Sequence, residues 1–300
     1  MDNLRKNVLI TGSSGLIGTS LTELLLSNGF NVSHLTSNRG KANSSKKIFY
    51  WSIDEGHIDS GAFSDVDYLV NLSGASIGGA IWTEKRKKLI YDSRIVGTRL
   101  LADEITRQKV TLKSYFGASA IGYYGSNDSE IPNLESDDGG GDFLANVCVD
   151  WEKEHMKFQS LSENVSVGRI SNVISKYGGM ADPYKLIAKF GLQMRLSKDS
   201  KRCAWVSLNS LTNMIFHLLT DPLAGTFNLC DGVLFWGDVQ KSMYAGFGKQ
   251  YLSLRIPSYM LKIAMGEMSA LITSSSNVSN EKIREALNMN GLNDVQKAMI

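Results

Sequence analysis

The sequence predicts an α/β fold in which a doubly wound parallel sheet is joined to a smaller, interwoven C-terminal α+β domain. Two observations support this prediction. Short apolar runs alternate with helical patterns through the first half of the chain, which is typical of crossover units in a parallel sheet. Beyond Ser171 this alternation weakens, and the remaining chain is mostly helical and rich in methionine.

The first element is a strand that ends in a glycine-spaced turn and continues into a helix. Residues Lys6–Gly18 read K-N-V-L-I-T-G-S-S-G-L-I-G, in which the apolar run suits a strand buried on both faces. Glycines leave space for a phosphate, and backbone N–H groups at a helix start bind such an anion. The pattern predicts a Rossmann-type dinucleotide-binding loop. Its expected cofactor-binding residues are Gly12, Ser13, Gly15, Leu16, Ile17 and Gly18.

The later elements follow from the same two periodicities. Apolar, β-branched runs predict strands, and apolar residues recurring along one side of a helix predict helices. The expected strands are Asn31–Thr36, Lys47–Ser52, Asp67–Leu72, Ser114–Ser119, Val165–Ser171, Arg202–Leu208 and Gly225–Leu229, and the expected helices are Leu89–Ile105 and Asp142–Leu161. We expect residues 1–170 to form the dinucleotide-binding domain, residues 203–229 to return to it, and residues 171–300 to form a smaller substrate-side domain.

Composition excludes several classes of partner. The 300 residues carry a net charge of +2, which is too balanced to indicate a nucleic acid or an anionic membrane as partner. No apolar stretch approaches the ~18 residues of a membrane span. The three cysteines are far apart and odd in number, which indicates a reducing compartment, the cytoplasm, without a disulfide framework. The four histidines lack metal-ligand spacing, so no metal is expected.

The residues after the second strand bear on the choice of cofactor. A site specific for NAD usually has Asp or Glu there to hold the ribose 2′-hydroxyl. Residues Leu35–Gly40 read L-T-S-N-R-G, without an acid and with Arg39. A guanidinium can bind a 2′-phosphate bidentately. We therefore expect NADP(H), although Arg39 can also be read as a solvated loop residue.

Several segments carry a resemblance to a known family. T-G-S-S-G-L-I-G resembles the Thr-Gly-x-x-Gly-x-x-Gly loop of extended short-chain dehydrogenases/reductases, and four later segments match that superfamily in order: N-L-S-G-A (Asn71–Ala75), S-R-I-V-G-T (Ser93–Thr98), A-S-A-I-G-Y-Y-G (Ala118–Gly125) and R-I-S-N-V (Arg169–Val173). More narrowly, the chain resembles the atypical "epimerase family" branch with a C-terminal domain of unknown function. The segments that indicate this branch are Trp82–Arg94, Asp142–Glu152 and Gly266–Met268.

The resemblance implies further site residues. Ser119 takes the place of the serine that hydrogen-bonds the substrate oxygen. Asn71, Ser73 and Gly74 are expected to line the cofactor at the carboxyl edge of the sheet, or else to serve strand-end turn chemistry. Arg94 can reach a phosphate or substrate anion, or pair with Asp92 or Glu104. Asn172 is expected at the nicotinamide amide.

At the usual catalytic pair the sequence departs from the superfamily. Other members have Tyr-x-x-x-Lys, in which the lysine charge lowers the pKa of the tyrosine. This chain has Cys148 and Glu152 there. A carboxylate one helical turn from a thiol raises the pKa of the thiol, so Cys148 is a poor substitute.

Three interpretations of this departure remain open. Cys148 can be a helix-packing residue, because free cysteine is often buried. Tyr123 or Tyr124 can serve as a relocated acid. Glu152 can act as a general base if burial raises its pKa, or can be a surface or N–H-bonded carboxylate.

Two functions from different classes follow. One is an NADP(H)-dependent oxidoreductase or epimerase acting on a small polar or nucleotide-linked substrate. The other is a catalytically degenerate NADP(H)-binding protein that regulates or scaffolds. Superfamily members are often dimers, so a homodimer is one option for assembly.

Overall fold

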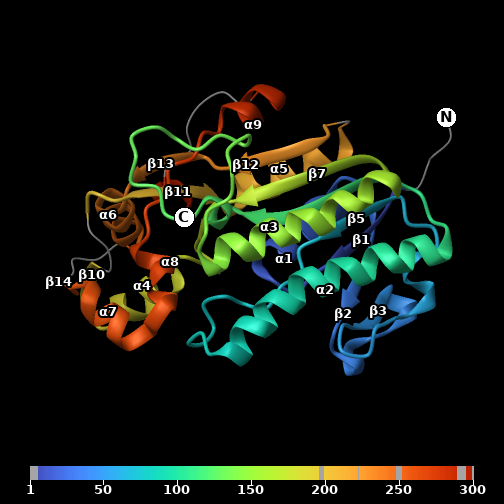
Figure 1. The fold of residues 1–300 in the computed structure, drawn as a ribbon, viewed down its shortest axis with the longest axis horizontal. Coiled ribbons are helices and arrows are strands. Elements are labelled where there is room, and N and C mark those ends of the chain that lie inside the picture. The colour runs from blue at the N-terminus through green and yellow to red at the C-terminus, as the bar shows by residue number, and fades with distance from the viewer. Residues whose placement is uncertain (1–5, 196–198, 222, 248–251, 289–294, 299–300) are drawn as a thin grey trace.

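The fold is a large, mostly parallel sheet between helices, with a second lobe at the carboxyl ends of its strands (Figure 1). The computed structural model describes residues 6–195, 199–221, 223–247, 252–288 and 295–298. The large sheet has eight strands in the order β12-β7-β6-β5-β1-β2-β3-β4. The expected doubly wound parallel sheet is thereby confirmed.

Most strands of the large sheet lie close to the expected bounds, helix α2 begins five residues before the expected Leu89, and helix α5 was not among the expected helices. The strands are β1 (Asn7–Thr11), β2 (Asn31–Thr36), β3 (Ile48–Ser52), β4 (His57–Ile58), β5 (Tyr68–Asn71), β6 (Leu112–Ala120), β7 (Ser162–Ile170) and β12 (Gly225–Leu229), and the helices are α1 (Leu16–Ser27), α2 (Glu84–Gln108), α3 (Phe143–Met156) and α5 (Leu208–Thr220). The short antiparallel strand β4 was not expected. No helix within the described ranges has both the length and the apolar character that a bilayer crossing requires.

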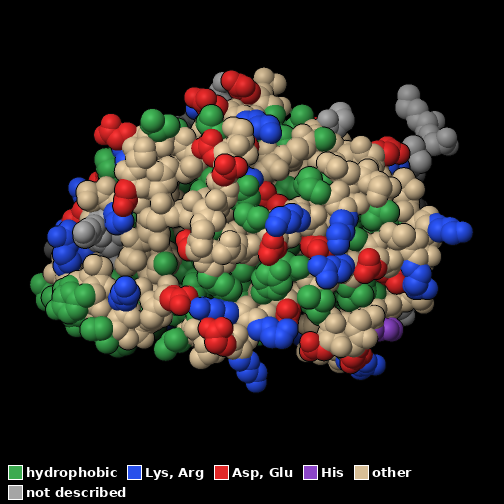
Figure 2. Space-filling model, viewed as in Figure 1, with side chains coloured by type: hydrophobic (Ala, Val, Ile, Leu, Met, Phe, Trp, Pro, Cys, Tyr) green, Lys and Arg blue, Asp and Glu red, His purple; other side chains and the backbone are tan. Residues whose placement is uncertain are grey.

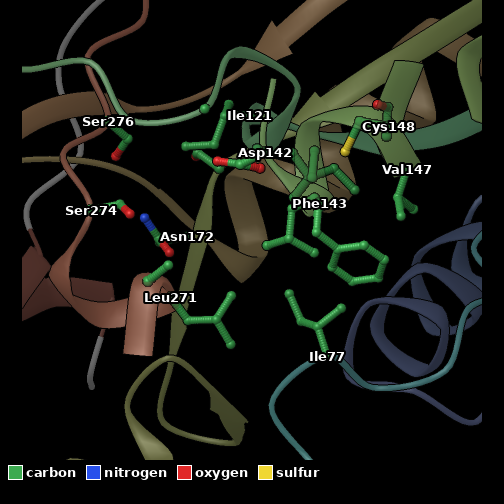
Figure 3. Close-up of a pocket in the computed structure, with 18 of the residues that line it drawn as sticks. Ile77, Ile121, Asp142, Phe143, Val147, Cys148, Asn172, Leu271, Ser274 and Ser276 are labelled. Carbon is green, nitrogen blue, oxygen red and sulfur yellow. The ribbon is translucent and has the colours of Figure 1, made fainter. Parts of the chain in front are cut away.

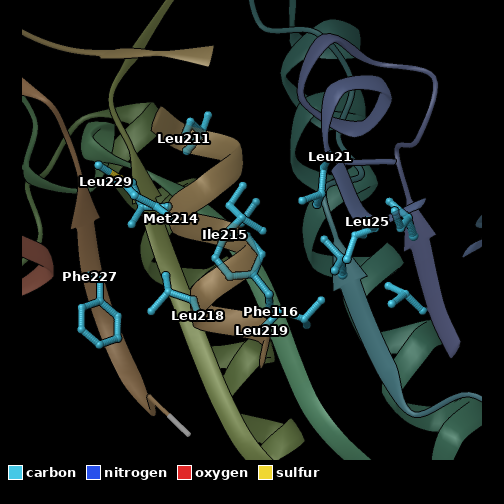
Figure 4. Packing of buried hydrophobic residues seen from close by; sticks show 14 of the residues in the cluster. Leu21, Leu25, Phe116, Leu211, Met214, Ile215, Leu218, Leu219, Phe227 and Leu229 are labelled. Carbon is cyan, nitrogen blue, oxygen red and sulfur yellow. The ribbon is translucent and has the colours of Figure 1, made fainter. Parts of the chain in front are cut away.

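The sheet separates two apolar cores because successive side chains of a strand point to opposite faces. On β1, Val8 and Ile10 belong to one core and Leu9 to the other, and all three are fully buried. Helices α1 and α5 cover the first face, where Leu21 of α1 and the apolar side of α5 meet the strands (Figure 4). Burial on both faces explains why the central strands read as continuous apolar runs.

The second lobe is built around a four-stranded sheet in the order β13-β11-β8-β9. Its strands are β8 (Asn172–Ser175), β9 (Gly178–Gly179), β11 (Arg202–Ser207) and β13 (Gly232–Phe235), and a separate pair joins β10 (Leu192–Arg195) to β14 (Leu252–Arg255). The helices of this lobe are α4 (Asp182–Ala188), α6 (Trp236–Gly246), α7 (Ser258–Met265), α8 (Ala270–Thr273) and α10 (Val295–Ala298). The expected strand at Arg202–Leu208 thus lies in the smaller sheet, whereas β12 lies in the large one.

The chain returns to the first lobe near its end. Helix α9 (Glu281–Ala286) places Ile283 in the core beside α5, and Lys282 donates to the carbonyl of Thr226 on β12. At the far tip of the second lobe, apolar side chains of α7 are exposed to solvent (Figure 2), with Ile263 82% and Tyr259 65% exposed. The two lobes are therefore interwoven, and the second one ends in an apolar surface.

A buried histidine under the sheet makes stability depend on pH. His155 of α3 is fully buried; its Nε2 donates to the Ala118 carbonyl and its Nδ1 accepts from the Tyr115 hydroxyl at 2.7 Å. Burial lowers its pKa from 6.5 to about 4. Between these pH values the unfolded chain binds the extra proton, so the free energy of unfolding falls as the pH falls.

We expect this loss to reach about 3 kcal/mol between pH 6.5 and 4. Urea denaturation at half-unit pH steps measures it. His155→Gln should flatten the dependence, whereas His217→Gln, on the exposed side of α5, should retain it. An unchanged profile in the His155 variant would contradict the assignment.

Candidate functional site

The carboxyl ends of the parallel strands open into one cavity of about 790 Å³ that continues into the second lobe. Ile17 of the glycine loop, Ser119 at the end of β6, Cys148 of α3 and Asn172 of β8 all line it. Side chains from both lobes face this space from opposite sides (Figure 3). This is where ligands bind in open α/β sheets.

The glycine loop is shaped for close backbone packing and for an anion. Gly12 has φ +69°, and a Cβ there would lie 2.7 Å from the Leu72 carbonyl oxygen. A Cβ on Gly18 would lie 2.4 Å from the Gly12 carbonyl oxygen. Gly15 is exposed at the N-terminus of α1, which has no side-chain cap and no acid in its first turn. The free N–H groups of Leu16 and Ile17 therefore remain available to a phosphate.

Hydrogen bonds of the Asn71 side chain link β1, the segment after β5 and α2. Its Oδ1 accepts from Thr11 Oγ1 at 2.7 Å and from Ser73 Oγ at 2.8 Å, and its Nδ2 donates to Thr98 Oγ1 at 2.9 Å. The residue is fully buried. Its amide is thus engaged by protein groups, and it fixes Thr11 and Ser73 behind the described cavity lining rather than presenting itself to a ligand.

Arg94 is a cation of the cavity that lacks an acidic partner among the described residues. Its Nη1 donates to the carbonyls of Ala75 and Ile90, each at 3.1 Å, and its guanidinium lies over the Trp151 ring. Burial lowers the pKa of Arg94. Gly74 makes room for it, because a Cβ there would lie 2.9 Å from the guanidinium carbon.

The alternative partners foreseen for Arg94 are occupied elsewhere. Asp92 pairs with Lys88, and Glu104 pairs with Arg107. Arg94 is half-buried, and a charge that is partly withdrawn from water is unfavourable without a counter-charge. Arg94 therefore has the properties of a group that meets an anion or several hydroxyl groups of a bound molecule.

Ser119 and Glu152 do come together, in a network that also contains Arg169. Ser119 and Arg169 are register partners on β6 and β7, and Glu152 of α3 meets both. The Ser119 hydroxyl donates to Glu152 Oε1 at 2.6 Å, and Arg169 Nε and Nη2 donate to the two carboxylate oxygens at 2.9 Å. Glu152 and Arg169 are 8% and 4% exposed. The pair is bidentate and buried, so the surface interpretation of Glu152 is wrong.

The charges of Glu152 and Arg169 stabilise each other within this network. Burial works against the charge of Arg169, but its hydrogen bonds to Glu152 and the carboxylate charge outweigh burial and raise the pKa of Arg169. Both oxygens of the Glu152 carboxylate already accept hydrogen bonds from protein donors. The geometry assigns Glu152 the role of anchoring Ser119 and neutralising Arg169.

The two tyrosines considered as relocated acids lie behind the cavity wall. Arg169 lies over the Tyr123 ring with its guanidinium carbon 3.5 Å from the centroid, and neither Tyr123 nor Tyr124 is among the described residues that line the cavity. The Tyr124 hydroxyl accepts from Arg169 and donates to Asn228. Burial raises the pKa of Tyr124. Both rings therefore support the buried arginine.

Cys148 is buried but borders the cavity. Burial, followed by the charge of Glu152, raises the pKa of its thiol to about 12. The thiol is therefore protonated near neutral pH. The expected direction of its pKa shift is confirmed, with burial as the larger cause.

Asn172 lines the cavity, whereas Arg39 lies outside its described lining. Asn172 Nδ2 donates to the Ala204 carbonyl at 2.8 Å, which directs its Oδ1 toward the cavity. Arg39 is exposed beyond β2, pairs with Glu55 at 2.9 Å and lies over the Tyr50 ring. A 2′-phosphate at Arg39 would share the guanidinium with Glu55.

Sequence reasoning missed Arg169 and the outer cavity wall. A signal for Arg169 was present, because an arginine in a strand buried on both faces needs a buried acid. The outer wall comes from Ile77, Phe143 and Leu271 and from the serine run 274–276. These segments are far apart in sequence, and no short motif links them. The described part of the chain holds no cluster of His, Cys, Asp or Glu side chains suited to a metal ion.

Comparison with known proteins agrees with this geometry. A family model described as "NAD dependent epimerase/dehydratase family" matches residues 8–213. Epimerase family protein Mb2239 of Mycobacterium bovis is 31% identical over 263 residues, which are 87% of this chain and 85% of that protein. Epimerase family protein SH2119 of Staphylococcus haemolyticus is 30% identical, covering 93% and 92%.

Solved structures share the fold. The human epimerase family protein SDR39U1 (isoform 2), crystallised with NADPH, superimposes with a TM-score of 0.83 at 21% identity, covering 98% of this chain and 97% of that one. MoeE5 in complex with UDP-glucose and NAD gives 0.76 at 12% identity, covering 98% and 96%. The sequence resemblance and the fold class are both confirmed.

Proposed function

Because the chain belongs to the NAD dependent epimerase/dehydratase family, we propose that it is an NADP(H)-binding oxidoreductase or epimerase-like protein that acts on a small molecule. One observation supports this most directly: a single cavity joins Ile17 of the glycine loop to Ser119 and to the second lobe. A dinucleotide and a second ligand can therefore meet in one cavity. A purely structural glycine turn would need no such cavity.

The residues present fit a nicotinamide dinucleotide. Gly12, Gly15 and Gly18, with the N–H groups at the start of α1, would hold its phosphates, and Arg94 and Asn172 would meet its nicotinamide side. Gly15 is exposed and Arg94 lacks an acidic partner among described residues, which suits these roles. When bound in its reduced form, the cofactor supplies a hydride to a carbonyl carbon, whose oxygen takes a proton from water to give an alcohol and the oxidised dinucleotide.

We expect the protein to bind NADPH at least tenfold more tightly than NADH, which is about 1.4 kcal/mol. The missing acid after β2, the position of Arg39, and the NADPH of the human relative support this preference. Isothermal titration with both nucleotides measures it. Arg39→Ala should remove most of the preference, and Glu55→Gln should strengthen NADPH binding by freeing the guanidinium.

Lys41→Ala is the matched control, because Lys41 is an exposed base in the same short helix, Arg39–Lys41. It should leave the preference unchanged. Equal affinities for the two nucleotides, or equal effects of the Arg39 and Lys41 variants, would contradict the 2′-phosphate assignment.

The second candidate is a dinucleotide-binding regulator or scaffold without turnover. Two observations favour it over a typical reductase. The described cavity lining contains no tyrosine, and the Ser119 hydroxyl donates its hydrogen bond to Glu152 rather than to a ligand. The site thus lacks the superfamily's usual proton donor.

A carbonyl panel followed by NADPH absorbance separates the two functions. Turnover that is lost in Ser119→Ala supports the enzyme, and NADPH binding without turnover supports the regulator. Glu152→Gln is a weaker probe, because it also leaves Arg169 without its counter-charge.

The remaining expectations about context are also proposals. A small polar or nucleotide-linked substrate, a cytoplasmic location, and the absence of nucleic-acid and membrane partners follow from the sequence alone. For a homodimer, the exposed apolar side chains of α7 offer support, since large exposed apolar patches often mark interfaces. Light scattering on the purified chain tests the dimer.

A further inference from the structure

We propose that the outer part of the cavity binds a neutral, largely apolar carbonyl compound or its alcohol, with an aromatic or branched-alkyl body, and excludes nucleotide diphosphates. This inference rests on the proposed function, names the substrate class of the same site, and replaces the small polar or nucleotide-linked substrate that the sequence alone suggests. Three features carry it: the apolar wall, the acidic groups at the cavity, and a small set of uncharged polar groups.

The wall is apolar on several sides. Ile121 and Val147 are buried at the inner edge, and Ile77, Phe143 and Leu271 face the open space from three different segments (Figure 3). Trp82 packs edge-on against Phe143 with ring centroids 5.4 Å apart, and its Nε1 donates to the Ile77 carbonyl. This aromatic cover fixes the loop before α2 over the cavity. Such a surface suits an apolar body.

The charges at this end do not suit a diphosphate. Phosphates bind to arginines and to helix N-termini. Asp142 places its carboxylate at the N-terminus of α3, where its Oδ1 already accepts from Ala145 N–H at 2.9 Å. Glu267 lies in the first turn of the short helix Gly266–Ser269 and also lines the cavity. Asp142 would repel a further anion beside the cofactor, and the charge of Glu267 is already balanced by Lys87.

The basic side chains nearby are directed elsewhere. Lys87 bridges from α2 to Glu267 at 2.9 Å, and Arg86 donates to the Ser76 carbonyl. Arg94 lies beside Gly74, close to the end of β5 and within the part assigned to the cofactor. Among the described lining residues this leaves Lys262, an exposed side chain of α7. A diphosphate carries two negative charges and would lack a paired, buried cation.

The polar groups that remain match an uncharged oxygen function. Ser276 Oγ accepts from the Ala204 N–H at 2.8 Å, which leaves its hydroxyl proton free to donate. Ser274 also faces the space, and no partner of its hydroxyl is found within the described residues. These groups can donate to a carbonyl or accept from an alcohol without a formal charge.

The test measures binding to the full chain saturated with NADP⁺, a state that cannot reduce a ketone. Isothermal titration with 2-acetonaphthone, a neutral aryl ketone, should give a saturable isotherm. UDP-glucose should bind at least tenfold more weakly, or give no heat. Leu271→Asn should weaken the ketone at least tenfold. Leu186→Asn, on the exposed side of α4 and outside the described cavity lining, is the control and should leave it unchanged.

The possible results separate this inference from the function on which it rests. Failure to bind NADP⁺ would remove the proposed function itself. Normal NADP⁺ binding with preferred binding of UDP-glucose, or with no binding of the ketone, would overturn the substrate class alone. Equal effects of the Leu271 and Leu186 variants would place the ketone outside the cavity and would also overturn it.

Discussion

Replacing Arg169 by methionine is expected to lower the free energy of unfolding by about 3–5 kcal/mol, because it leaves the carboxylate of Glu152 buried without a counter-charge. Methionine keeps much of the side-chain volume, so the loss reports the charge rather than a cavity. The Ser119 hydroxyl and the guanidinium are the two donors that Glu152 has in this network. Urea denaturation followed by circular dichroism measures the change.

Arg99→Met provides the matched control. Arg99 of α2 pairs at 2.7 Å with Glu154 of α3, the helix that also carries Glu152, and the Arg99 side chain is 49% exposed. The buried Glu154 carboxylate also pairs with Lys157 at 2.6 Å and keeps that counter-charge in Arg99→Met, so this variant should lose far less stability. The double variant Arg169→Met with Glu152→Gln should be more stable than Arg169→Met alone, since it leaves no buried charge. A loss no larger than that of Arg99→Met would show that water reaches the Glu152 carboxylate.

Alanine at Gly18 and alanine at Gly15 should have opposite consequences. A Cβ on Gly18 would lie 2.6 Å from the Ser13 Cα as well as against the Gly12 carbonyl, so the loop or α1 must move. Overpacking of this kind costs about 1–3 kcal/mol or more in stability. We expect Gly18→Ala to unfold more easily and to lose dinucleotide binding with it.

Gly15→Ala should keep the fold and lose affinity. Gly15 has φ −78°, which suits any residue, and its Cβ would come no closer than 3.3 Å to the Gly12 carbonyl oxygen. Stability should change by no more than about 1 kcal/mol, while a methyl group at the exposed start of α1 weakens NADPH at least tenfold. Thermal denaturation and NADPH titration of both variants measure the two effects. Full NADPH affinity in a stable Gly15→Ala protein would remove the phosphate from this loop.

Most of the large sheet was predictable because its signals are local. The apolar run Val8–Ile10 and the glycines that follow it specify strand, turn and helix within a few residues. The smaller sheet has no such signal. A single residue, Ser171, separates the end of β7 from the start of β8 at Asn172, and β8 pairs with β11 thirty residues later in the chain. The register of such short strands with distant partners is set by tertiary packing. The hydrophobic periodicity of the sequence carries no information about that packing.

In the candidate site, too, the residues of local motifs were predictable and the long-range contacts were not. Gly12, Gly15, Gly18 and Ser119 could be placed from sequence because each belongs to a short motif. The partner of Glu152 could not, because its identity depends on the register that sets Ser119 beside Arg169 on neighbouring strands. The carboxylate at the usual lysine position becomes intelligible only with that arginine. The sequence motif shows that the usual lysine is absent. The structure shows that Glu152 is tolerated at that position because Arg169 pairs with it.

The interweaving of the two lobes determines where this chain can be divided. It passes between the sheets at Ser171, at Ser207, between β12 and β13, and again before α9. These passages are tied to one another, since Ser171 N–H donates to the Leu229 carbonyl and Asn280 donates to the Cys230 carbonyl. A fragment ending at residue 170 would lack α5, β12 and α9 and would leave β7 as an open edge prone to aggregation. We therefore expect a single cooperative melting transition and no separately expressible halves.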